Sequence, residues 1–194
     1  MNDRVYSLFG IVGPLLAYVC IGVSIALSSW FTWQSSALSD LGHSIKSDVA
    51  SIFNIGLLSA GFLVMIFAIT VFRKHAKYTS VWMLLSAFSL QLVATFDEVY
   101  GFLHFTVSVL LFSCFGVTSI VYALEKKSRL AVIVFIVSLV SWSVYGMNIF
   151  VIGVAVPETM SSIARVCLMP LLMALNPQSC GLLRRDKSEL NYFQ

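Results

Sequence analysis

Hydrophobic residues form six long runs along this chain, and short polar connections separate the runs. A helix needs about 20 apolar residues to cross the hydrocarbon core of a membrane, and barrel strands would be shorter and would alternate. The pattern therefore predicts six spanning helices: Val5–Phe31, Val49–Phe72, Thr79–Ala94, Phe102–Leu124, Leu130–Val154 and Ser161–Leu183. We expect an all-α integral membrane protein, a six-transmembrane-helix bundle that forms a single domain over residues 1–188.

The composition agrees with a membrane protein. Hydrophobic residues make up 59% of the 194 residues and charged residues only 11%, whereas soluble domains carry about 25% charged residues. No basic patch interleaved with aromatic residues lies outside the apolar runs, so we expect no nucleic-acid partner. The last residues, 189–194, resemble the remnant of a protease tag and are left out of the functional reasoning.

Positive charge is concentrated on one side of the predicted bundle. Every Lys and Arg except Lys46 and Arg165 lies before the first run, after the last run, or in the connections after the second and fourth runs. The positive-inside rule then places both termini in the cytoplasm. We expect a multi-pass protein of the cell (plasma) membrane, with membrane lipids as partners; the sequence leaves a homo-oligomer open.

The longest polar interruption, Ser35–Ser51, lies between the first two runs and reads SSALSDLGHSIKSDVAS. The predicted topology places it on the outer face together with two other connections that carry acids and a histidine. We therefore predict an outward-facing polar cavity built from Asp40, His43, Asp97, His104, Glu158 and Arg165.

Spacing suggests how part of this cavity forms. If the fourth helix begins near Asp97, then Asp97, Tyr100 and His104 share one helix face. Ionisable residues inside a membrane are costly and usually face the bundle interior, so we expect His104 and Arg165 to point inward. The structural alternative is that the acids cap helix N-termini, with Thr95 to Glu98 as a capping box, and that His104 is a hydrogen-bonded core residue.

Three kinds of function fit such a cavity. The leading prediction is the binding, with modification left open, of a lipid or amphiphile whose phosphate or carboxylate meets Arg165 and Lys46. The first alternative is a metal-dependent intramembrane hydrolase; zinc would be its metal, although the chain has no HExxH motif and we expect no cofactor. The second alternative is a structural or partner-binding protein without pocket chemistry. A serine nucleophile at Ser36 or Ser39 lacks the flanking glycines of a nucleophile elbow.

Two motifs resemble a known family. Residues 37–42 read ALSDLG and residues 51–57 read SIFNIGL, and a prokaryotic six-span group, domain-of-unknown-function family 998, carries LSDLG-type and FN-x-GL-type motifs at these places. The chain is more distantly similar to DRAM-like membrane proteins, which have been linked to lipid and GPI-anchor remodelling or autophagy. The resemblance implies a six-span layout and no particular reaction. The matching positions are Ser39, Asp40, Gly42 and Asn54.

The first motif also has a physical interpretation. Asp40 and Gly42 suit a tight turn, and Asn54 lies deep enough in the second helix to need a hydrogen-bond partner. We predict that the loop folds over the outer mouth of the bundle and bonds Asn54 or His104. The candidate ligand-binding residues are Ser39, Asp40, His43, Asn54, Asp97, His104, Glu158 and Arg165; no catalytic residue or metal ligand is assigned.

Overall fold

The computed structural model describes residues 3–148 and 153–163, and all regular structure in these ranges is helical. The five long helices are α1 (Asp3–Leu27), α2 (Ala50–Phe67), α4 (Lys77–Thr95), α5 (Phe102–Lys126) and α6 (Arg129–Gly146). Each belongs to a stretch that is long and apolar enough to cross a membrane. The predicted all-α class is therefore confirmed, and the apolar helices fit a multi-pass membrane bundle.

Shorter elements complete the described part of the chain. A 3₁₀ turn, η1 (Ser39–Gly42), lies in the loop between α1 and α2, and a second one, η3 (Glu98–Tyr100), precedes α5. A π-helical turn, η2 (Ala68–Phe72), and α3 (Arg73–His75) extend α2. Residues 155–163 are also helical.

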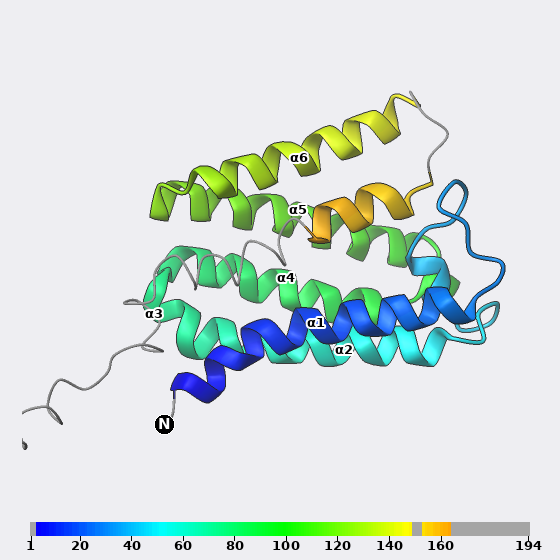
Figure 1. Ribbon diagram of the computed structural model, residues 1–194, viewed down its shortest axis with the longest axis horizontal. Helices are drawn as coiled ribbons and strands as arrows, with labels where there is room; N and C mark the ends of the chain where they lie inside the picture. The colour runs from blue at the N-terminus through cyan, green and yellow to red at the C-terminus, as the bar shows by residue number, and fades with distance from the viewer. Residues whose placement is uncertain (1–2, 149–152, 164–194) are drawn as a thin grey trace, which may run out of the picture.

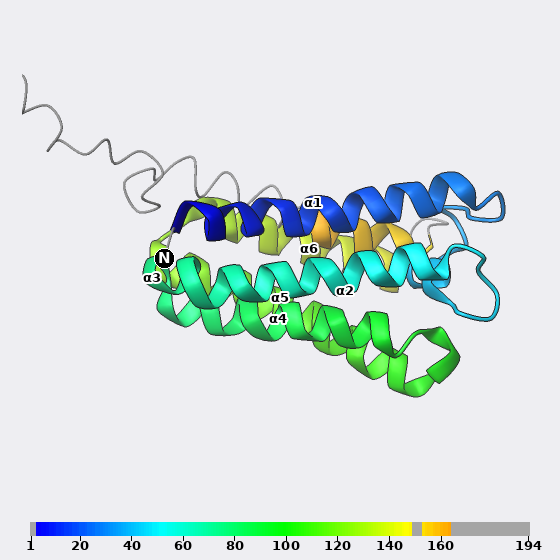
Figure 2. The same cartoon turned by 90° about the horizontal axis from the view of Figure 1, so that it is seen from below.

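The long helices run side by side along the longest axis of the molecule (Figure 1). Neighbours in the sequence are neighbours in space, since α1 packs on α2, α2 on α4, α4 on α5, and α5 on α6. A view turned by 90° shows α1 beside α2, with α4 and α5 on the other side of α2 (Figure 2). The loop after α1, η1 and the start of α2 lie at one end of the bundle, and the described N-terminus lies at the other.

Glycines let α2 approach its neighbours closely. A Cβ added to Gly56 would collide with Cys20 of α1, and one added to Gly61 would lie 2.8 Å from the Ala87 carbonyl oxygen of α4. Small residues at such positions let helices pack by van der Waals contact where lipid offers no hydrophobic driving force. Gly56 and Gly61 therefore allow α2 to pack closely against α1 and α4.

The structure corrects several predicted boundaries. The fifth apolar run was predicted to form one helix to Val154, but α6 ends at Gly146 and Asn148 adopts a left-handed φ of 55°. A new helix begins at residue 155, ahead of the predicted start at Ser161. The rest of the predicted sixth span lies outside the described residues. The first helix also ends earlier than predicted, at Leu27 rather than Phe31.

Candidate functional site

Three segments that are distant in sequence meet at the end of the bundle that carries η1. The Gly153 amide donates to the Trp33 carbonyl at 2.9 Å, and the Ala155 amide donates to the Ser36 carbonyl at 3.0 Å. The Leu38 amide donates to Oε2 of Glu158 at 2.7 Å, across 120 positions of sequence. The loop after α1 is thereby fastened to the start of the helix at residues 155–163.

The LSDLG turn is held from both sides. Oδ2 of Asp40 accepts the Ala37 amide at 2.7 Å, and Nδ2 of Asn54 donates to the Gly42 carbonyl at 2.8 Å. A Cβ on Gly42 would lie 2.6 Å from Oδ1 of Asn54, so a larger residue cannot enter without displacing that side chain. The predicted contact between the loop and Asn54 is confirmed, and Asn54 supports the turn.

Three carboxyl groups gather behind this turn: Asp40, Glu98 and Glu158, which we call the acid cluster. Oε1 of Glu98 accepts the Ser39 hydroxyl at 2.7 Å, and the Glu98 carboxyl is also hydrogen-bonded to Asp40. Burial raises the pKa of Glu98, the hydrogen bond and charge of Asp40 raise it further, and Ser39 and His104 oppose the rise. The Glu98 carboxyl is therefore harder to ionise than a carboxyl in water.

Glu158 is the most perturbed member of the acid cluster, and it lies ahead of the predicted sixth span. Burial raises the pKa of Glu158 to about 7, the charges of Glu98 and Asp40 add to the rise, and the Leu38 amide opposes it. Like charges that share a poorly solvated site disfavour joint ionisation. The raised pKa of Glu158 brings the titration of its carboxyl into the neutral pH range.

His104 is buried, with 8% of its surface exposed, as predicted. Its Nδ1 lies 2.7 Å from the Phe96 carbonyl oxygen, and its Nε2 lies 3.3 Å from the Ser108 hydroxyl. A carbonyl can only accept, so Nδ1 carries the hydrogen and Nε2 of the neutral ring is an acceptor. A protonated His104 lowers the pKa of Glu98, so the ring lies within electrostatic range of the acid cluster.

Asp97 has partners of its own in the loop and in η3. Oδ2 of Asp97 accepts the Ser44 amide at 2.9 Å and Oδ1 accepts the Val99 amide at 3.0 Å. Burial alone would raise the pKa of Asp97, but the hydrogen bonds from Ser44 and Val99, with the charge of His43, lower it below its ordinary value. Asp97 therefore joins the loop to η3 and does not belong to the acid cluster.

The predicted shared face of Asp97, Tyr100 and His104 is wrong. Gly101 adopts a φ of 54°, which interrupts the helix, and α5 begins only at Phe102. Tyr100 is 56% exposed, whereas His104 is buried. The predicted capping box from Thr95 is also wrong, because Thr95 ends α4 and the side chain of Asp97 caps η3.

A cavity of about 830 Å³ opens beside the acid cluster, and we call it the α5–α6 cavity. Its polar end is lined by Ser39, Glu98, His104 and Glu158. Most of the rest of its lining is apolar or aromatic and includes Phe105, Phe112, Leu139 and Trp142. The cavity thus carries proton acceptors at one end and a long apolar wall.

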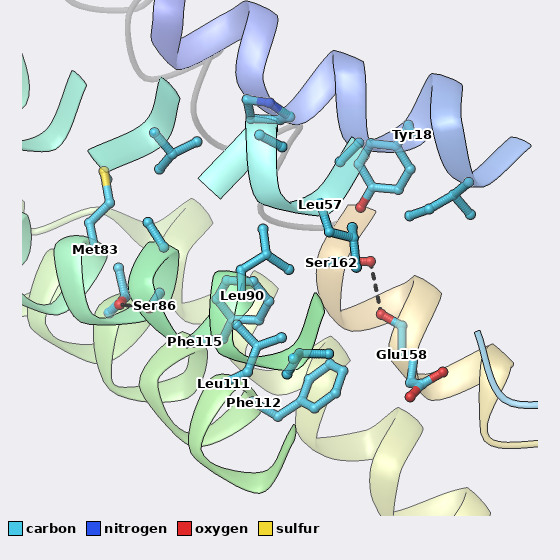
Figure 3. Close-up of a pocket in the computed structure, with 18 of the residues that line it drawn as sticks. Tyr18, Leu57, Met83, Ser86, Leu90, Leu111, Phe112, Phe115, Glu158 and Ser162 are labelled. Atoms are coloured by element: carbon cyan, nitrogen blue, oxygen red, sulfur yellow. Dashed lines mark hydrogen bonds between the residues drawn. The ribbon is translucent and has the colours of Figure 1, made fainter. Parts of the chain in front are cut away.

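A second, smaller cavity of about 200 Å³ lies among α1, α2, α4, α5 and residues 155–163. Figure 3 shows Leu57, Leu90, Leu111 and Phe115 around it, with Glu158 at its edge. Ser39, Ser108, Phe112 and Glu158 line both cavities. The two cavities therefore meet beside Glu158 of the acid cluster.

Neither of the two cations predicted to meet the ligand is among the described lining residues of either cavity. Lys46 is exposed and lines neither cavity; Arg165 lies outside the described residues. The sequence suggests only a helix-capping role for Glu98. Its partners Ser39 and Asp40 on η1 and His104 on α5 come together only in the fold, so sequence spacing does not predict them. In the described part of the chain, no three His, Cys, Asp or Glu side chains are placed to hold a metal ion.

Residues 11–175 match a family model described as "Protein of unknown function (DUF998)". This match confirms the resemblance indicated by the LSDLG and FN-x-GL motifs. The similarity to DRAM-like proteins and a prokaryotic origin stay predictions. No curated protein and no solved structure matches the chain.

Proposed function

Because the chain belongs to DUF998, a family described only by its unknown function, we propose its function from the site: it binds a membrane amphiphile in the α5–α6 cavity. The polar group of this amphiphile lies against Ser39, Glu98, His104 and Glu158, and its apolar part lies along α5 and α6. The single observation that carries the proposal is that one cavity combines polar groups that are buried (His104) or half-buried (Ser39, Glu98 and Glu158) at one end with an aromatic and aliphatic wall. Ligand sites in proteins have this composition.

The proposal includes an orientation in the plasma membrane. Six spans place both termini in the cytoplasm and the acid cluster at the outer face. The support is the distribution of Lys and Arg, which favours the cytoplasmic side for the connections after α2 and α5. With this orientation the α5–α6 cavity takes its ligand from the outer leaflet.

Native mass spectrometry of the purified protein tests the binding. Ser113 of α5 is exposed and lines the α5–α6 cavity, whereas Leu110 of the same helix is exposed and does not line it. We expect Ser113→Trp to fill the cavity and to reduce the retained amphiphile about tenfold. Leu110→Trp adds a similar side chain elsewhere and should retain the wild-type amount.

The outcome separates the alternatives. Equal retention in the two variants contradicts the cavity as the binding site, and no retained amphiphile in any sample favours the structural or partner-binding function. Stoichiometric zinc that is lost in His104→Ala would instead favour the metal-dependent hydrolase.

A further inference from the structure

The polar end of the α5–α6 cavity offers acceptors rather than donors. Oε2 of Glu158 is already bonded to the Leu38 amide, and Oε1 of Glu98 to the Ser39 hydroxyl. Because the Ser39 hydrogen is given to Glu98, its oxygen faces any further partner as an acceptor. Nε2 of the neutral His104 ring accepts from the Ser108 hydroxyl at 3.3 Å, since Nδ1 donates to the Phe96 carbonyl, and this leaves the Ser108 oxygen as an acceptor. A ligand that fits this end must bring hydrogen-bond donors.

Among the described residues that line the α5–α6 cavity there is no Lys or Arg, and Glu98 and Glu158 are its acids. Asp40 adds a third carboxyl behind Glu98. Carboxylates withdrawn from water need a charged or hydrogen-bonding partner, since their mutual repulsion is poorly screened there.

We propose that the amphiphile is a long-chain amine, with a protonated amino group against Glu98 and Glu158 and no phosphate beside it. This inference rests on the proposed function and names its ligand class. An ammonium group supplies three donors and one positive charge in a compact volume. A phosphate at the same place would meet the acid cluster and gain no cationic partner from the described lining.

Binding of an ammonium group should also release a proton from the site. A bound ammonium favours the ionised carboxyls, so binding lowers the pKa of Glu158 and releases a proton near neutral pH. The groups that act on Glu158 are the Leu38 amide from the loop, Asp40 from η1 and Glu98 from η3, while His104 of α5 acts on Glu98. An alkylamine stays protonated in this range, as lysine does. Amine affinity should therefore rise between pH 6 and pH 8.

Three probes with the same alkyl chain test the head group: octadecylamine, N-octadecylacetamide and octadecyl phosphate. Binding is measured on the full chain in phosphatidylcholine nanodiscs, with empty nanodiscs subtracted to remove partition into lipid. We expect octadecylamine to bind at least tenfold more tightly than the other two. Its affinity should fall about tenfold from pH 8 to pH 6, while that of the acetamide stays constant.

Variants locate the effect. Glu98→Gln keeps the size of the side chain and should reduce octadecylamine affinity about tenfold while leaving the acetamide unchanged. Asp48→Asn removes an exposed acid from the same end of the molecule and should leave both unchanged. If Glu98→Gln lowers the thermal midpoint, the ratio of amine to acetamide affinity within that variant still reports the charge.

The binding data separate a failure of the amine inference from a failure of amphiphile binding itself. Equal binding of amine and acetamide, both lost in Ser113→Trp, would overturn the amine inference and leave amphiphile binding intact. Stronger binding of octadecyl phosphate would also overturn it. If no probe binds above empty nanodiscs, the proposed function itself fails.

Discussion

Single residues at the loop end perform different tasks although they have similar chemistry. Asp97 accepts two backbone amides, whereas Glu98, the next residue, faces Ser39 and Asp40. Their pKa values move in opposite directions, because hydrogen bonds prevail at Asp97 and burial prevails at Glu98. Adjacent acids therefore separate into one that shapes the loop and one that lines a cavity.

Glu158 predicts a pH dependence of stability. Its folded pKa of about 7 lies above the ordinary 4.5, so its contribution is complete below about pH 4.5 and is lost as the pH rises through 7. Each unit of difference between the folded and unfolded pKa changes the free energy of unfolding by about 1.4 kcal/mol. We expect the apparent unfolding midpoint in detergent to fall between pH 5 and pH 8 in the wild type.

Glu158→Gln is the matching variant. It removes the titration of Glu158 and should reduce the slope of the profile in this range, and the raised pKa of Glu98 accounts for the slope that remains. Asp97 does not interfere, because its lowered pKa confines its titration to pH values below its ordinary 3.8. A profile that keeps its slope in Glu158→Gln would assign the dependence to another group.

At the scale of elements, the position of α2 decides the geometry of the bundle. It packs against α1 and α4, and its first turns hold Asn54 under the LSDLG turn. Gly56 and Gly61 allow the two close approaches. Any change that pushes α2 outward also moves the support of the loop.

Gly61→Ala tests the approach of α2 to α4. The added Cβ would lie 2.7 Å from Cγ of Gln91 and 2.8 Å from the backbone oxygen of Ala87, which cannot move alone. We expect a loss of about 1–3 kcal/mol, as in overpacked cores, seen as a lower unfolding midpoint.

Gly22→Ala is its control, because a Cβ there meets nothing within 4 Å. Alanine is the better helix former by up to about 1 kcal/mol, so the midpoint should stay constant or rise. An equal loss in both variants would mean that α2 and α4 do not approach as closely as described.

At the scale of the whole molecule, one end carries the loop and the acid cluster, and the other carries the basic connections after α2 and α5. The basic end should stay in the cytoplasm because cytoplasmic connections carry an excess of Lys and Arg. The orientation decides from which leaflet the α5–α6 cavity would take the proposed amphiphile.

Cysteine labelling in whole cells tests this orientation, in a background without native cysteines. Ser44 is exposed in the loop, and Tyr78 at the basic end is 68% exposed. An impermeant maleimide should label Ser44→Cys in intact cells and Tyr78→Cys only after permeabilisation. The reverse pattern would place the cavity at the cytoplasmic face.

Much of the bundle could be predicted from the sequence, and the errors have local causes. The bounds of α2, α4 and α5 lie within a few residues of the predicted runs. The fifth run was extended too far because Val151, Ile152 and Val154 continue its apolar composition, although Asn148 has already turned the backbone. Hydrophobicity indicates where a helix is stable in lipid but not where backbone conformation ends it.

The sequence by itself determined the helical class, because a chain in lipid must satisfy each backbone group within its own helix, and long apolar runs report this directly. Only the tertiary structure decided which acids meet. Ser39 and Glu98 are 59 positions apart, and Leu38 and Glu158 are 120 apart. Those contacts depend on the paths of three connections and on the close packing of α1, α2 and α4, and no local spacing encodes them.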